Sequence, residues 1–251
     1  MTTVPAPIPF ARSRYPDQSL HGRIVHAIGR RILHGDLPPG ALLPAEPELG
    51  ASRTVVREAV KVLAAKGLVE SRPKTGTRVR PRNAWNLLDP DVLAWQHDGA
   101  VDAALLRTLT EVRRIIEPAA AELAAARADA RDIVALERAL QQMEAAAGPP
   151  RGADVEAFVE ADMRFHLAIL QACRNDLLEQ MSRVVYSALL VSFRSTSSRP
   201  GRAKAALPRH RAILEAIRAR DPRGAGAAMR HLVQSTAREI EALGKRPRTR
   251  R

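Results

Sequence analysis

The sequence predicts a mainly α-helical protein in two parts, an N-terminal winged helix-turn-helix and a C-terminal all-α bundle. The first part is indicated by residues 52–82, where an amphipathic helix is followed by a small basic hairpin. The second is indicated by the Ala-rich chain from Val101 onward, which has helical periodicity and no strand-like alternation. Only 3% of the 251 residues are aromatic, so the core is expected to consist of Ala, Leu, Val and Ile, a composition that favours helices.

Residues 52–67 form the best-defined predicted helix of the first part. Ser52 is a good N-cap, and Gly67 suits the position just beyond the last turn. Apolar side chains recur at helical spacing on one side, and basic side chains four residues apart form a ridge on another side. The apolar set is Val56, Val60 and Leu63, and the basic set is Arg53, Arg57 and Lys61.

A short basic hairpin follows this helix. Residues 68–72 and 77–80 predict two strands, and residues 73–76 provide the turn between them. In a winged helix-turn-helix, such a helix enters the major groove of double-stranded DNA while the wing reaches the adjacent backbone. The residues expected to contact DNA are Arg53, Thr54, Arg57, Lys61, Thr75 and Gly76.

Another helix is predicted at the start of this domain, over residues 19–35. Ile24, Ile28 and Ile32 lie four apart and would face the core, and the run GDLPPG ends the helix. The histidines of this helix are interpreted as surface or packing residues; they are His21, His26 and His34.

The distribution of charge agrees with a nucleic-acid partner for the first part. The net charge is +13, and residues 1–82 hold 14 Lys or Arg against 6 Asp or Glu. Residues 83–243 hold 21 of each, and the short tail 244–251 adds five basic residues. A basic excess confined to one domain is what binding to phosphates requires.

The cysteine count and the hydropathy pattern exclude further classes of protein. The single cysteine, Cys173, excludes an internal disulfide and suits a reducing cytoplasm. No apolar run approaches the roughly 18 residues of a membrane span. The Pro-rich residues 1–18 lack the apolar core of a signal peptide and are expected to form a flexible lead. We therefore expect a cytoplasmic protein with no membrane partner.

Residues 83–100 are interpreted as a compact apolar linker. They contain both tryptophans, Trp85 and Trp95, which are predicted to pack between the two domains. From Val101, helices separated by Gly- and Pro-rich breaks are expected to form a bundle. The predicted helices span 101–128, 132–146, 154–174, 176–196, 202–220 and 222–243.

Four side chains of this bundle have the chemistry of a divalent metal site. Asp162 and His166 are four apart and share one face of a helix, while His210 and His231 lie on two further helices. Three imidazoles and one carboxylate suit Zn²⁺ or Ni²⁺ inside a bundle. From spacing alone, however, a solvated Asp–His ion pair is the more common outcome.

The sequence resembles the DNA-binding domain of GntR-type transcription factors in three stretches: LPAEPEL, SRTVVREAVKVLAAKGLVESR and TGTRVRPR. The helical part is similar to the FCD domain, the effector-binding domain of FadR-like members. The string NAWNLLDPDVLAWQ resembles the linker of sugar-acid-responsive members. The resemblance implies a homodimeric regulator, more often a repressor, that binds a pseudo-palindromic operator and responds to a small carboxylate.

The resemblance also implies roles for residues of the bundle. Arg113 would point into the effector cavity and pair with a ligand carboxylate, with Arg114 as the competing choice. The residues alone indicate instead an i,i+4 pair of Arg113 with Glu117. Asn175 resembles a cap residue of the family and is expected to end the metal-binding helix. The implied metal ligands are Asp162, His166, His210 and His231.

One stretch departs from the family pattern. About four residues, roughly one helical turn, are missing between Leu49 and Ser52, and Pro47 stands where relatives carry a basic residue. The first helix of the helix-turn-helix is therefore expected to be a single turn or not helical. As a result, we expect the recognition helix, which is the helix predicted over residues 52–67, to be held less firmly.

Two other classes of function remain open on the sequence. One is a metal-dependent enzyme that uses the Asp/His set, although no general base, nucleophile or oxyanion hole is placed near it. The other is a non-specific DNA-binding protein with a vestigial sensor, which would bind DNA with salt dependence but without sequence preference. We expect the protein not to be an enzyme.

Overall fold

The computed structural model describes residues 19–44, 46–96, 103–148, 154–181 and 201–244. The chain divides into two compact units, Met1–Ala100 and Val101–Arg251. The expected lead (1–18), most of the tail and the greater part of the predicted helix 176–196 lie outside the described residues. None of the helices in the described part of the chain has the length and hydropathy of a membrane span.

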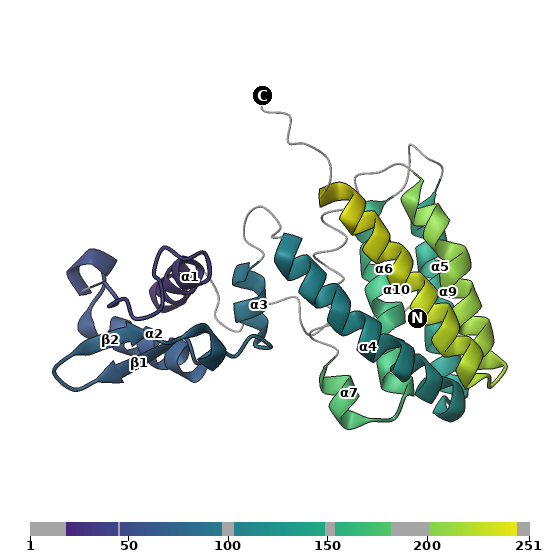
Figure 1. Cartoon of the computed structure of the whole chain (residues 1–251), viewed down its shortest axis with the longest axis horizontal. Coiled ribbons are helices and arrows are strands. Elements are labelled where there is room, and N and C mark those ends of the chain that lie inside the picture. The colour runs from purple at the N-terminus through teal and green to yellow at the C-terminus, as the bar shows by residue number, and fades with distance from the viewer. Residues whose placement is uncertain (1–18, 45, 97–102, 149–153, 182–200, 245–251) are drawn as a thin grey trace, which may run out of the picture. The chain divides into compact units, whose positions relative to one another are not determined.

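The first unit is a winged helix-turn-helix, as the sequence predicts (Figure 1). Helix α1 packs on α2, and the three isoleucines of α1 share one buried cluster with Ala59 and Leu63 of α2. The elements are α1 (Leu20–Leu33), η1 (Glu46–Leu49), α2 (Arg53–Ala65), β1 (Val69–Arg72), β2 (Gly76–Val79), η2 (Arg82–Ala84) and α3 (Pro90–Gln96).

The wing is an antiparallel hairpin whose register runs from Val69 opposite Val79 to Arg72 opposite Gly76. Gly76 has a φ of 83°, which an L side chain rarely adopts, so the turn needs a glycine there. Leu42 forms an isolated bridge to Arg78, which ties the chain before η1 to the wing. The hairpin is therefore anchored at its base and exposed at its tip.

The first helix of the helix-turn-helix is reduced to the single 3₁₀ turn η1, in agreement with the four-residue shortening seen in the sequence. Leu49 of this turn packs against the core of the unit. A single 3₁₀ turn offers little surface to brace the recognition helix α2, so its position depends on α1 and on contacts at its C-terminal end.

Residues 83–96, interpreted from the sequence as a linker, pack into the first unit. Trp85 and Trp95 are both buried, and Trp95, with 1% of its surface exposed, belongs to the same core as α1 and α2. This segment also packs against the turn that leads from α2 into β1, where Gly67 is required because a Cβ there would lie 2.3 Å from the carbonyl oxygen of Ala84.

The second unit is an all-α bundle, as predicted. Helix α10 packs along α4 and α9, and α5 packs along α6 and α9 (Figure 1). A stripe of buried alanines on α4, among them Ala121, Ala124 and Ala125, lets neighbouring helices approach closely. The helices are α4 (Ala103–Arg127), α5 (Ala130–Ala147), α6 (Val155–Ala172), α7 (Asp176–Gln180), α9 (Arg202–Arg218) and α10 (Pro222–Gly244).

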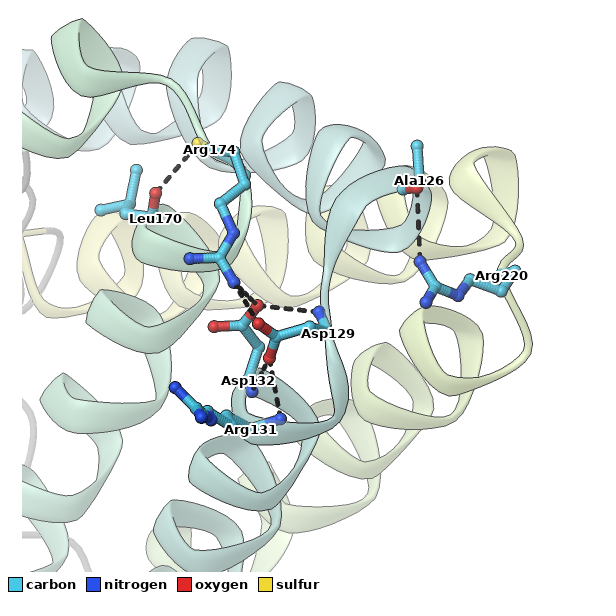
Figure 2. A network of polar contacts seen from close by, with 8 residues as sticks. Ala126, Asp129, Arg131, Asp132, Leu170, Arg174 and Arg220 are labelled. Carbon is cyan, nitrogen blue, oxygen red and sulfur yellow. Dashed lines mark hydrogen bonds and ion pairs between the residues drawn. The ribbon is translucent and has the colours of Figure 1, made fainter.

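At one end of the bundle, arginine side chains connect neighbouring segments of the chain. Arg174 pairs with Asp129 and Asp132, the two members of the capping box that starts α5, and Arg220 donates to the carbonyl of Ala126 (Figure 2). The expectation that Asn175 ends the metal-binding helix is wrong. Helix α6 ends at Ala172, and the Asn175 side chain instead caps the start of α7.

Candidate functional site

The described residues bring together three of the four predicted metal ligands. Asp162 and His166 come from adjacent turns of α6, and His210 comes from α9. All three side chains are buried, and one ligand atom from each lies within 4.8 Å of the other two. A group of this kind can hold a metal ion inside a helical bundle.

Hydrogen-bond roles indicate which nitrogen each imidazole presents to the cluster. His210 Nδ1 lies 3.0 Å from the carbonyl oxygen of Ala206, and because a carbonyl only accepts, Nδ1 must donate. His166 Nδ1 lies 2.8 Å from Glu117 Oε2, an ion-pair contact in which the carboxylate attracts a proton to Nδ1 although the pair does not have hydrogen-bond geometry. In the neutral imidazoles, both Nε2 atoms are then left as lone-pair donors to a cation.

The donor atoms of the cluster lie close to one another. Asp162 Oδ1 lies 2.6 Å from His210 Nε2 and 3.5 Å from His166 Nε2. Neither Asp162 Oδ1 nor His210 Nε2 makes a hydrogen bond within the described residues. With Nδ1 of His210 donating elsewhere, two electron-pair donors face each other at close range. A proton or a metal ion between them relieves this repulsion.

Glu117 of α4 joins this cluster to Arg113. Its Oε1 accepts from Arg113 Nε at 2.5 Å, while its Oε2 faces His166, and both Glu117 and Arg113 are buried. A carboxylate behind a metal-binding imidazole fixes the ring and strengthens it as a ligand. The sequence indicated only the i,i+4 pair of Arg113 and Glu117, and that pair is present.

Neighbouring charges keep Glu117, His166 and Asp162 ionised although all three are buried. Burial opposes ionisation of Glu117, but Arg113 and His166 outweigh it and lower the pKa of Glu117 to about 2. Burial likewise opposes the charge of His166, but Glu117 and Asp162 outweigh it and raise the pKa of His166 to about 9. His210 and His166 hold the pKa of Asp162 well below its usual range despite burial. In the absence of metal, His166 is therefore a charged imidazolium at neutral pH, with a proton on each ring nitrogen.

Arg113 has binding capacity that its own helix does not use. Its Nη1 is buried and makes no hydrogen bond within the described residues, although Nε and Nη2 both reach Glu117. An unsatisfied buried guanidinium nitrogen is costly unless a ligand or water supplies an acceptor. The competing residue, Arg114, is exposed.

The structure does not bring His231 into the cluster. Its side chain is exposed on α10, whereas the neighbouring Met229, Leu232 and Val233 are buried. The apolar residues of α10 determine which face turns inward, and His231 lies outside that face. The ligand set within the described residues is therefore Asp162, His166 and His210.

The residues predicted to contact DNA lie on the surface of the first unit. Four of them are exposed on α2, away from its buried face, and Lys61 forms an ion pair with Glu58 at 2.7 Å. Thr75 and Gly76 are exposed at the tip of the wing. The four residues on α2 are Arg53, Thr54, Arg57 and Lys61.

Comparison with known families defines the class of protein. Residues 20–79 match the bacterial regulatory proteins of the gntR family, and residues 108–235 match the FCD domain. The chain belongs to the GntR family of bacterial regulatory proteins, and within it to those with an FCD domain.

Individual relatives narrow this class. The chain is 38% identical over 226 residues to the galactonate operon transcriptional repressor of Escherichia coli strain K12, covering 88% of this chain and 96% of that protein. It is 33% identical over 216 residues to the Uxu operon transcriptional regulator of the same organism, covering 81% of this chain and 80% of that protein. These relatives are regulators of transcription and not enzymes.

Solved structures agree with this assignment. A GntR protein of Streptococcus agalactiae is 27% identical, with a TM-score of 0.50 over 87% of this chain and 99% of that one. The Listeria monocytogenes protein Lar, 19% identical, has a TM-score of 0.64 over 90% of this chain and 98% of that one, a likeness in fold alone.

Proposed function

We propose that this protein is a homodimeric, operator-binding transcriptional repressor whose DNA affinity is controlled by a sugar acid bound at a divalent metal ion in the FCD domain. Asp162, His166 and His210 would hold the metal, and Arg113 would pair with the carboxylate of the effector. The observation that carries the proposal is the convergence of these buried side chains, with two imidazole Nε2 atoms and one carboxylate oxygen directed at one another.

The chemistry of the site suits a carboxylate effector. Zn²⁺ or Ni²⁺ with three protein ligands keeps at least one coordination position open. The unused Nη1 of Arg113 offers a second, charged contact for the same anion. The similarity to the galactonate operon repressor makes hexonic acids, and galactonate first among them, the ligands to try.

The DNA-binding part of the proposal rests on the exposed basic ridge of α2 and on the wing beside it. Arg53 and Arg57 would reach bases or phosphates, Thr54 and Lys61 would contact the backbone, and the wing tip would contact the adjacent phosphates. Two such units related by a dimer axis would read a pseudo-palindromic operator. Repression follows the similarity to the galactonate operon repressor.

Thermal unfolding of the full chain tests the effector class. A ligand that binds only the folded state raises the melting temperature. We expect galactonate or a related sugar acid to do so for the Zn²⁺-loaded protein, and chelation of the metal to abolish most of the shift. Neutral sugars of the same length serve as controls. A panel of sugar acids that shifts neither the loaded nor the chelated protein would contradict the proposed effector class.

A further inference from the structure

The C-terminal end of the recognition helix is held by a buried ammonium group. Lys66 is the C-cap residue of α2, and only 6% of its surface is exposed. Its Nζ lies 2.7 Å from Asp89 Oδ1 and 2.7 Å from Asp91 Oδ2. The backbone carbonyl of the same residue accepts from Asn86 N at 3.0 Å. The side chain of Lys66 therefore connects α2 to the start of α3, and its backbone connects α2 to the segment that leads into α3.

This arrangement stabilises two helix ends at once. Asp89 Oδ1 also accepts from the backbone N–H groups of Asp91 and Val92, so it caps the N-terminus of α3. A carboxylate at a helix N-terminus and an ammonium at a helix C-terminus are each favourable to the helix dipole. Burial disfavours the ammonium, but Asp89 and Asp91 outweigh this and raise the pKa of Lys66, so it stays charged.

The other end of α3 is seated on α1. The indole of Trp95 lies against Gly29, where a Cβ would come within 2.5 Å of the ring. Trp95 Nε1 donates to His26 Nδ1 at 2.7 Å, and the carbonyl of Trp95 lies 3.1 Å from His34 Nε2. The missing side chain at Gly29 and the two histidines thus fix α3 in one position on the DNA-binding unit.

Chain connectivity gives this contact a role. Helix α3 is the last described element before α4 begins at Ala103, so in the sequence only residues 97–102 separate it from the first helix of the second unit. The turn η1, which would normally brace α2 from its other side, is a single 3₁₀ turn. Within the described residues, the contacts made by Lys66 accordingly give the recognition helix a buried polar anchor.

We propose that Lys66, held by Asp89 and Asp91, is a positioning residue for operator recognition: it fixes α2 to α3 and so sets the orientation in which α2 meets DNA. The proposal rests on the DNA-binding role proposed above for α2. It predicts that loosening this anchor impairs the alignment of side chains with bases and leaves attraction to phosphates unchanged.

The test compares specific and non-specific binding in full-length variants. A duplex selected from a random-sequence pool by the wild-type protein serves as the operator, and a scrambled duplex serves as the reference at the same salt concentration. We expect Lys66→Met to weaken operator binding about tenfold or more, the usual cost of losing one aligned base contact, with little change on the scrambled duplex. Lys204→Met, a change of an exposed lysine on α9, is the matched control.

A milder variant keeps the proposal testable if Lys66→Met folds poorly. Asp91→Asn preserves shape and removes one charge, and we expect a smaller loss with the same preference for the operator. If the two residues act as one unit, the double variant Lys66→Met/Asp91→Asn loses no more operator affinity than Lys66→Met alone. Additive losses, or equal losses on operator and scrambled duplex, would overturn the positioning role.

Fluorescence separates this proposal from the proposed DNA surface. The chain has two tryptophans, so a Trp85→Phe background leaves Trp95 as the only indole, 5.7 Å from Lys66 Nζ. We expect Lys66→Met to shift Trp95 emission to longer wavelength as α3 loosens. Full operator affinity in the Lys66→Met variant overturns the positioning role, whether or not the Trp95 emission shifts. If instead the DNA-binding role proposed for α2 is wrong, an Arg57→Ala variant binds the operator as well as wild type.

Discussion

A double His166→Ala/His210→Ala variant should carry almost no divalent metal, whereas the wild-type protein should carry about one ion per chain. The two imidazoles supply two of the three ligands that converge in the bundle, and Asp162 alone would be a weak site for Zn²⁺ or Ni²⁺. Elemental analysis of purified protein, after Zn²⁺ has been added back and the excess removed, measures the difference directly.

His231→Ala is the matched control for this experiment. It removes a histidine from the same unit, but its side chain is exposed and lies outside the cluster, so the metal content should stay at the wild-type level. Loss of metal in His231→Ala would restore the four-ligand set that the sequence implied. Wild-type protein without metal after Zn²⁺ addition would contradict the site altogether.

Metal uptake should also depend on pH in a defined direction. His166 has a pKa of about 9 in the metal-free chain, so at pH 7 the ion must displace its proton. Affinity should therefore rise between pH 7 and 9 and change little above that range. Calorimetry in buffers of different ionisation enthalpy should report about one proton released per ion at pH 7. No proton release would mean that His166 is not a ligand.

Arg57→Ala should have the largest effect of any single substitution on DNA recognition. Arg57 lies at the middle of the exposed ridge of α2, and a bidentate contact of an arginine with guanine contributes about 1–3 kcal/mol of discrimination. Fluorescence anisotropy with operator and scrambled duplexes should show a loss on the operator that is several times larger than the loss on the scrambled sequence.

Arg138→Ala serves as the charge-matched control, because Arg138 is exposed on α5 of the other unit. It should leave both affinities within experimental error of wild type. Equal losses for Arg57→Ala on both duplexes would assign Arg57 to the phosphate backbone. No loss on either duplex would remove it from the interface.

Local patterns account for what the sequence predicted correctly. The four-residue spacing of Ile24, Ile28 and Ile32 determines which face of α1 is buried, and no other part of the chain is needed to infer it. Asp162 and His166 share a face of α6 for the same reason. The shortening before Ser52 was also evident, since a helix cannot form from residues that are absent.

Tertiary packing accounts for what it did not predict. Successive helical residues differ by about 100° in direction, so a small difference in the register of α10 decides between burial of Leu232 and burial of His231. The orientation of α10 against its neighbours sets that register. Glu117 was visible as a partner of Arg113, but its contact with His166 joins α4 to α6 and has no signal in spacing.

The segment after the wing illustrates the same limit. The apolar residues around Trp85 and Trp95 predicted burial, but not the unit in which they are buried. Lys66, at the end of an amphipathic helix, has the sequence features of a solvent-exposed residue. Its burial depends on two carboxylates more than twenty positions away, which only the folded chain brings to it.

Release from the operator is the measurement that tests the central claim most directly. Operator occupancy is followed while a sugar acid, galactonate first, is titrated into Zn²⁺-loaded wild type and into His166→Ala/His210→Ala. We expect the ligand to lower occupancy in the wild type and to leave the variant bound to DNA, because the effector needs the metal to bind. Equal release in both proteins, or no release by any sugar acid from the loaded wild type, would contradict the proposed metal-held effector site.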